Sequence, residues 1–199
     1  MIALLVDAVL GVRYAGESEG GSLDRHAETL LAAAVPSYSG RPADFVIQFG
    51  TPAMVILLAV VLAAICLATG NRPLAVLAVV GPGLAGLATT LLKPFIGRTI
   101  DGGFAYPSGH TGGATSIAIV VALLLLSRWQ LPRAAALTVL FGTALVAGIG
   151  MAAALVSAEV HYPTDTIGGF CTSVVCVLGT ALLIDAVTGR TQQNRSVSA

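Results

Sequence analysis

Charged residues are scarce in this sequence: only 10% of its 199 positions are Asp, Glu, Lys or Arg, against about a quarter in a typical soluble domain. Hydrophobic residues make up 56%, and the mean hydropathy is +0.89. So few charges cannot cover a water-exposed surface, which excludes an ordinary soluble fold and makes a lipid bilayer the expected solvent. The length suits a single membrane-embedded domain over residues 1–199.

Other features that are rare or missing exclude further classes of protein. The formal net charge is zero and there is no basic run, so we expect no nucleic-acid partner. The three cysteines (Cys66, Cys171 and Cys176) lie inside apolar runs without the paired spacing of a zinc or redox motif. We expect them to be buried apolar side chains.

What the sequence does have is long apolar segments. Five of them approach or reach the roughly 17–25 residues that a tilted helix needs to cross a bilayer, and they cover residues 45–69, 74–92, 111–126, 134–156 and 166–187. Residues 1–12 are shorter and contain Asp7 without a basic start, so we expect a short first span rather than a signal peptide. Whether Met1 is the natural start stays open. The predicted fold is an all-α integral membrane protein, a bundle of six transmembrane helices.

Two segments outside the spans carry separate expectations. In residues 23–36, acidic and basic positions alternate with leucines and alanines, which predicts an amphipathic helix at the membrane surface between the first two spans. Residues 189–199 are polar and predict a disordered tail.

Basic residues near span ends indicate the orientation in the membrane. With six spans, five arginines fall on one face: Arg72, Arg128, Arg133, Arg190 and Arg195. The other face also has five: Arg13, Arg25, Arg41, Lys93 and Arg98. Since several of the second set belong to a candidate site or to the acidic surface segment, the first set places the C-terminus in the cytoplasm.

Three short polar stretches flank the spans: residues 93–98, 106–111 and 161–165. The first two share one loop of the six-span arrangement, and the third lies two crossings later. Loops separated by two crossings emerge on the same membrane face, so the three stretches can meet in one site.

Together these stretches suit phosphate chemistry without a metal ion. Lys93 and Arg98 offer positive charge, and Ser108-Gly109 predicts a helix start whose free N–H groups suit an anion. Asp165, four residues after His161, can bind one imidazole nitrogen and leave the other free to attack phosphorus. His110 can then protonate the leaving oxygen.

Each stretch also has a plainer interpretation. Lys93 and Arg98 can be interfacial anchors, residues 107–109 a turn before a capped helix, and His161 with Asp165 a structural hydrogen bond. The joint occurrence of two of the three histidines with a lysine and an arginine on one face favours a site.

These residues resemble the type-2 phosphatidic acid phosphatases, a family of membrane enzymes that includes bacterial lipid and isoprenyl-diphosphate phosphatases. Pro107-Ser108-Gly109-His110 matches the middle motif of that family, the spacing from His161 to Asp165 matches half of the third, and Lys93 with Arg98 matches part of the first. The motifs span about residues 91–169.

The resemblance implies roles for the matching residues. His161 would be the nucleophile, Asp165 its orienting partner and His110 the general acid, while Lys93, Arg98, Ser108 and Gly109 would hold phosphate. It also implies no metal or other cofactor and a site at the outer face of the membrane. Two family arginines are missing, since Ile100-Asp101 stands in place of an Arg-Pro pair and Leu155 in place of an arginine.

The leading functional hypothesis is therefore a lipid phosphate phosphatase of the bacterial plasma membrane, acting on a phosphatidic-acid-type or polyprenyl-phosphate-type substrate through a phosphohistidine. The alternative is a weak or inactive member of the fold that binds phospholipid headgroups. A transporter is disfavoured, because apart from Asp7 the spans carry almost no charge. The sequence does not indicate an oligomeric state.

Overall fold

Helices dominate the computed structural model, which describes residues 1–34, 40–129 and 131–197, with side chains through residue 189. The elements in chain order are α1 Ile2–Arg13, α2 Ser22–Ala34, α3 Arg41–Gln48, α4 Pro52–Ala68, α5 Arg72–Ile96, β1 Thr99–Ile100, β2 Gly103–Phe104, α6 Gly109–Leu126, α7 Arg133–Ser157 and α8 Pro163–Val197. The two short strands pair antiparallel in a hairpin between α5 and α6.

Four helices, α5 to α8, are each long and apolar enough to cross a membrane. A fifth span arises if α3 and α4, which meet at an angle of 51°, are counted as one broken helix. The predicted all-α membrane fold is confirmed, but the residues that the structure describes contain four or five candidate spans instead of the six expected. Helix α1 has 12 residues, about 18 Å of helix, against about 30 Å of hydrocarbon core.

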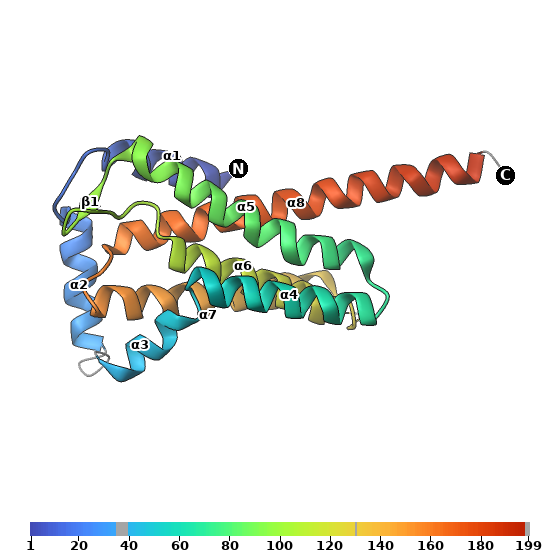
Figure 1. Cartoon of the computed structure of the whole chain (residues 1–199), viewed down its shortest axis with the longest axis horizontal. Helices are drawn as coiled ribbons and strands as arrows, with labels where there is room; N and C mark the ends of the chain where they lie inside the picture. Colours follow the sequence, from blue (N-terminus) through green and yellow to red (C-terminus); the bar gives the residue numbers. More distant parts are fainter. Residues whose placement is uncertain (35–39, 130, 198–199) are drawn as a thin grey trace.

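The spans lie side by side in Figure 1 and alternate in direction along the chain. Their core contains Leu62 of α4, Leu77 of α5, Val120 of α6, Ala144 of α7 and Val177 of α8. Helix α1 packs beside the first half of α8, and α2 stands across one end of the bundle, at the left of Figure 1. We call this end, where α6 and α8 begin, the site end.

Local sequence signals explain where the spans begin and stop. Proline occupies the first turn of α4 and α5, where its missing N–H costs nothing. The Asn71 side chain caps α5 by accepting a hydrogen bond from the backbone N–H of Leu74. Helix α5 ends at Gly97, whose φ of 70° is left-handed, and the chain turns there into the hairpin.

The two segments predicted outside the spans have different outcomes. The amphipathic surface helix is present as α2, Ser22–Ala34, and the last two residues of its predicted range, 35–36, lie outside the described residues. At the other end, α8 continues as a helix to Val197, across most of the predicted disordered tail. Each residue added to an existing helix gains a backbone hydrogen bond, so a polar sequence can extend one that has already started.

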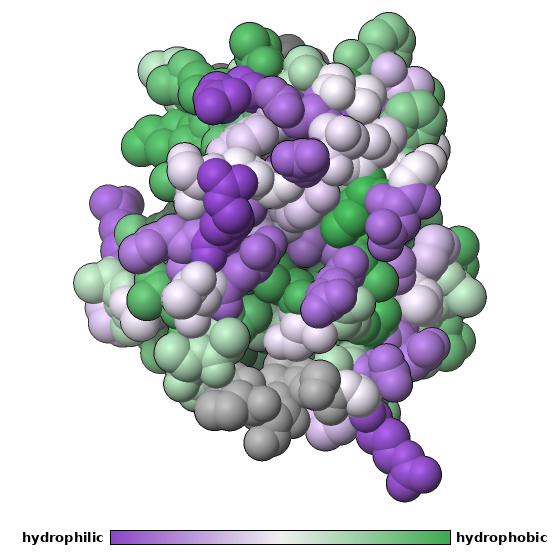
Figure 2. Space-filling model, turned by 90° about the vertical axis from the view of Figure 1, so that its left-hand side faces the viewer, coloured by the Kyte–Doolittle hydropathy of each residue, from purple (hydrophilic) through white to green (hydrophobic). Residues whose placement is uncertain are grey.

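Viewed along the bundle from the site end, hydrophilic side chains gather over much of the face (Figure 2). Large apolar side chains such as Ile56, Leu87 and Ile149 are instead exposed along the flanks of the spans. This distribution is that of a bundle whose sides contact lipid and whose site end contacts water.

Candidate active site

The start of α6 forms one wall of the site. Ser108 is its N-cap, as predicted, and its Oγ accepts a hydrogen bond from the N–H of Thr111 at 3.3 Å. Ser108 is completely buried, whereas Gly109 and His110 in the first turn are partly exposed. Gly109 and His110 are therefore accessible at the site end, whereas Ser108 is not.

The start of α8 lies against the same loop. The backbone N–H of Ser108 donates to the carbonyl of Asp165 at 2.9 Å, and Ser173 Oγ donates to the carbonyl of Gly112 at 2.7 Å. This close approach needs Gly169, because a Cβ there would collide with the carbonyl of Ser108. Motifs more than 50 residues apart in the sequence are thereby joined at one place.

His161 and Asp165 face each other at the beginning of α8. His161 is 9% exposed, and its Nδ1 lies 3.5 Å from Asp165 Oδ2, beyond a good hydrogen bond. That nitrogen is buried and has no hydrogen-bond partner. Asp165 Oδ2 instead accepts the N–H of Tyr162 at 2.9 Å. Such contacts tighten in many enzymes only when substrate binds, so the pair can hold the imidazole with its other nitrogen free.

Lys93 and His110 lie at the same end. Lys93 Nζ donates to the carbonyl of Phe104 at 2.9 Å, which ties the last turn of α5 to the hairpin. His110 is close enough to interact electrostatically with both His161 and Lys93, and Lys93 interacts likewise with Asp165. The structure thus brings together Lys93, His110, His161 and Asp165, four of the seven predicted site residues, with Ser108 and Gly109 next to them.

Arg98 takes a different place from the one expected of a phosphate ligand. Its side chain is fully buried, with Nη1 at 2.7 Å from Asp165 Oδ1 and Nη2 at 2.7 Å from Asp24 Oδ2. The guanidinium also lies between the rings of Tyr14 and Tyr162, at 4.3 and 4.4 Å from their centroids. Only Nε lacks a partner. Arg98 is therefore committed to two carboxylates rather than presented to a ligand.

Both positions where the resembling family has an arginine are apolar in this chain. Leu155 is 1% exposed near the end of α7, and Ile100 is half-buried in β1. With Arg98 occupied as well, Lys93 is the cation within the described residues that acts on His110. The site is poor in positive charge for one that would hold phosphate.

Sequence reasoning missed Asp24. This carboxylate of α2 is completely buried and accepts hydrogen bonds from Arg98, from the N–H and hydroxyl of Thr164, and from the N–H of Gly21. Burial alone would raise the pKa of Asp24, but these hydrogen bonds outweigh it and hold the pKa below its ordinary value. Its partners Arg98 and Thr164 are 74 and 140 residues away, so nothing local in the sequence signals the contact.

Asp7 and Tyr106 make a second contact between parts of the chain that are distant in sequence. Tyr106 is 1% exposed, and its hydroxyl donates to the Asp7 carboxylate at 2.7 Å. The other oxygen of Asp7 accepts from the hydroxyl of Thr172 at 2.7 Å. Burial is the main cause that raises the pKa of Tyr106 far above its usual range, and the hydrogen bond to the Asp7 carboxylate adds to it. These contacts fasten α1 to α8 behind the site.

No group of three His, Cys, Asp or Glu within the described residues is arranged to hold a metal ion. The cysteines do not join the site: Cys66 and Cys171 are buried, Cys176 is partly so, and all three are free thiols.

Comparison with known proteins gives two matches. The family model described as the PAP2 superfamily matches residues 91–188. A solved structure, the first transmembrane PAP2 type phosphatidylglycerolphosphate phosphatase from Bacillus subtilis, superposes with a TM-score of 0.69 and 18% identity over 94% of each chain. No curated protein matches. The likeness in fold extends over the full bundle. The segment matched by the family model contains all of the predicted site residues and places the chain in the PAP2 superfamily of membrane phosphatases.

Proposed function

We propose that this protein is a lipid phosphate phosphatase, which removes phosphate from a phosphomonoester or diphosphate carried by a membrane lipid. The observation that carries the proposal is the convergence of His110 and His161, from two different helices, beside Lys93 and Asp165 at one end of the bundle. The phosphatidylglycerolphosphate phosphatase named above has the same fold, and we extend to this chain the general class of substrate, a lipid phosphate.

The proposed reaction has two steps. In the first, Nε2 of His161 attacks phosphorus while the bond to the lipid oxygen breaks, and His110 gives that oxygen a proton. In the second, water attacks the phosphohistidine, gives a proton to His110 and releases phosphate with His161 restored. Asp165 holds the Nδ1 side of His161, and Lys93 with the first turn of α6, at Ser108 and Gly109, holds the phosphoryl oxygens. No step requires a metal ion or another cofactor.

The lipid tail needs an apolar place beside this headgroup site. A groove of about 290 Å³ opens along the flank of the bundle, bounded by α3, α4, α6 and α7. Ala114, one turn beyond His110, lines it together with Phe49, Val146 and Gly150. A substrate whose phosphate reaches His110 could therefore keep its hydrocarbon chain in this groove and in the surrounding bilayer.

We also propose that the site faces the outside of a bacterial plasma membrane. Arg72, Arg128 and Arg133 are exposed at the end of the bundle opposite the site: Arg72 and Arg133 are the first residues of α5 and α7, and Arg128 lies in the connection between α6 and α7. The excess of arginine in short connections favours the cytoplasmic side for that end. The side chains of Arg190 and Arg195 lie outside the described residues.

Phosphate release from a panel of lipid phosphates in the presence of EDTA tests the proposal. The panel should include phosphatidic acid, phosphatidylglycerol phosphate and a polyprenyl phosphate and diphosphate. We expect EDTA-resistant release that falls at least about 1000-fold in His161→Ala, because the nucleophile is lost. His26→Ala is the matched control, since His26 is exposed on α2. Equal release by wild type and His161→Ala, or none by either, would overturn the enzyme assignment.

A second candidate function is headgroup binding with slow or no turnover. It is favoured by Leu155 and Ile100 in place of two arginines and by the engagement of Arg98 with carboxylates. An arginine that acts only in the transition state can contribute orders of magnitude to phosphoryl transfer. Saturable binding of a lipid phosphate without release of phosphate would establish this function instead.

A further inference from the structure

The buried carboxylate of Asp24 has no part in the reaction described above. Resting on the proposed function, we propose that Asp24, on the surface helix α2, is a positioning residue: it fixes Arg98 and the first turn of α8, and through them it holds Asp165 beside His161. Arg98 is in this account a positioning residue too, rather than a ligand of phosphate.

Both carboxylate oxygens of Asp24 accept hydrogen bonds. Oδ2 accepts from Arg98 Nη2 at 2.7 Å and from the N–H of Gly21 at 2.9 Å. Oδ1 accepts from the N–H of Thr164 at 2.9 Å and from its hydroxyl at 2.7 Å. Thr164 directly precedes Asp165, so the carboxylate of Asp24 grips the backbone of the turn that carries Asp165.

Burial distinguishes Asp24 from the rest of its helix. Of the residues of α2, all of which the structure describes, Asp24 is the buried one. Its neighbours Leu23 and Arg25 are exposed. A buried carboxylate is costly unless it is paired and hydrogen-bonded, and a surface helix could sit on this end of the bundle without one. Its presence on α2 therefore points to a role for the charge itself.

Charge balance explains how Asp24 would act on Asp165. Arg98 lies between two carboxylates, with Nη2 on Asp24 and Nη1 on Asp165, and its faces are covered by Tyr14 and Tyr162. Without the charge of Asp24, the buried guanidinium would have a single anionic partner and would bind Asp165 more strongly. The negative charge that Asp165 offers to Nδ1 of His161, 3.5 Å away, would be correspondingly smaller.

The first test separates positioning from binding. In Asp24→Asn, which keeps the shape of the side chain, we expect kcat to fall about 10- to 100-fold, the range for lost partners of a functional histidine, with KM changed less than about twofold. Glu28→Gln, one turn further along α2, is the matched control and should keep the kcat and KM of wild type. A rise in KM with kcat unchanged would instead place Asp24 or Arg98 in phosphate binding and overturn the proposal.

A double-mutant cycle with Asp165→Asn is the second test. If Asp24 acts through Asp165, Asp24→Asn should lower kcat strongly in the wild-type background and less than about twofold when Asp165 is already Asn. Equal effects in the two backgrounds would contradict the proposal. Should Asp24→Asn fail to fold, Thr164→Val removes one hydroxyl from the same network, and we expect a several-fold loss of kcat that also disappears in the Asp165→Asn background.

The outcomes distinguish this inference from the proposed function. If wild type releases phosphate and His161→Ala does not, while Asp24→Asn and Thr164→Val match wild type, the positioning role fails and the phosphatase assignment stands. If wild type itself releases none, the proposed function fails first.

Discussion

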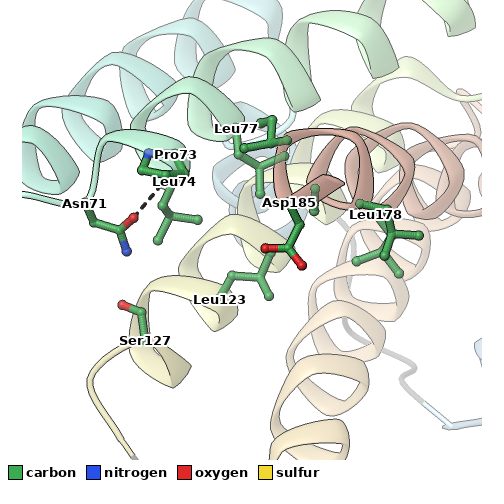
Figure 3. Close-up of a pocket in the computed structure, with 11 residues that line it drawn as sticks. Asn71, Pro73, Leu74, Leu77, Leu123, Ser127, Leu178 and Asp185 are labelled. Atoms are coloured by element: carbon green, nitrogen blue, oxygen red, sulfur yellow. Dashed lines mark hydrogen bonds between the residues drawn. The ribbon is translucent and has the colours of Figure 1, made fainter. Parts of the chain in front are cut away.

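The two ends of this bundle are built differently. At the site end, the buried charged side chains Asp24, Arg98 and Asp165 are joined in one network. At the opposite end, a cavity of about 480 Å³ lies between α5, α6 and α8, lined mostly by apolar side chains (Figure 3). Its charged group, Asp185, is solvent-exposed, and Asn71 there only caps α5. The proposed catalysis thus belongs to one end of these helices, whereas the other end shows ordinary apolar packing.

The largest effect after loss of the nucleophile should come from Lys93. Lys93→Ala removes the available cation beside His110, and we expect kcat/KM for a lipid phosphate to fall about 10- to 100-fold, mainly through a higher KM, as for loss of a charge-assisted hydrogen bond. Arg72→Ala, at the opposite end, should leave the kinetics unchanged. Similar losses in both variants would mean that positive charge acts at long range rather than in the site.

Close packing of α8 should matter next. In Gly169→Val the new side chain would meet the carbonyl of Ser108, so α8 must shift away from α6. We expect a loss of about 1–3 kcal/mol in stability, together with lower kcat because His161 moves with the helix. Gly179→Ala on the same helix, where a Cβ meets nothing within 4 Å, is the control. Thermal unfolding in detergent and phosphate release measure the two effects, and unchanged activity in Gly169→Val would contradict the close contact.

The two acidic groups of α2 should respond oppositely to pH. The pKa of Asp24 is lowered from 3.8, so its contribution to stability is present above that pH and is lost as the pH falls below it. The pKa of Glu28 is raised from 4.5, mainly by burial and also by the negative charge of Asp24. Above that pH the ionised carboxylate of Glu28 therefore destabilises the folded protein. At neutral pH, Asp24→Asn should therefore lower the melting temperature and Glu28→Gln should raise it slightly. A melting temperature for Asp24→Asn that matches wild type at neutral pH would show that the network adds no stability.

The smallest effect is expected at the opposite end of the bundle. Asp185→Asn changes the charge beside the apolar cavity, far from the two histidines, and phosphate release should stay within about twofold of wild type. A loss comparable to that of Lys93→Ala would show that the two ends are coupled.

The sequence predicts the helices and the meeting of the three motifs well, because both follow from long apolar runs and from the alternation of loops between two faces. Ser108 as an N-cap follows from local chemistry and is confirmed. Helix α1 is the exception among the spans: its composition resembles a span, but 12 residues cannot cross the bilayer.

The surroundings of Arg98 could not be predicted in the same way. An arginine near a phosphate motif suggests a phosphate ligand, yet its charged partners in the structure are Asp165, 67 residues away, and Asp24, 74 residues away. The pattern of α2 indicates a surface helix but not which carboxylate turns inward. Contacts of this kind depend on how elements distant in sequence pack, and that information is not local.

The most direct test of the account is to identify the phosphorylated residue. Wild-type protein mixed briefly with a lipid phosphate, quenched in alkali and digested should carry phosphate on His161, stable in base and lost in acid, and His161→Ala should carry none. Phosphate on another residue, or turnover at full rate in His161→Ala, would contradict the central claim that His161 attacks phosphorus.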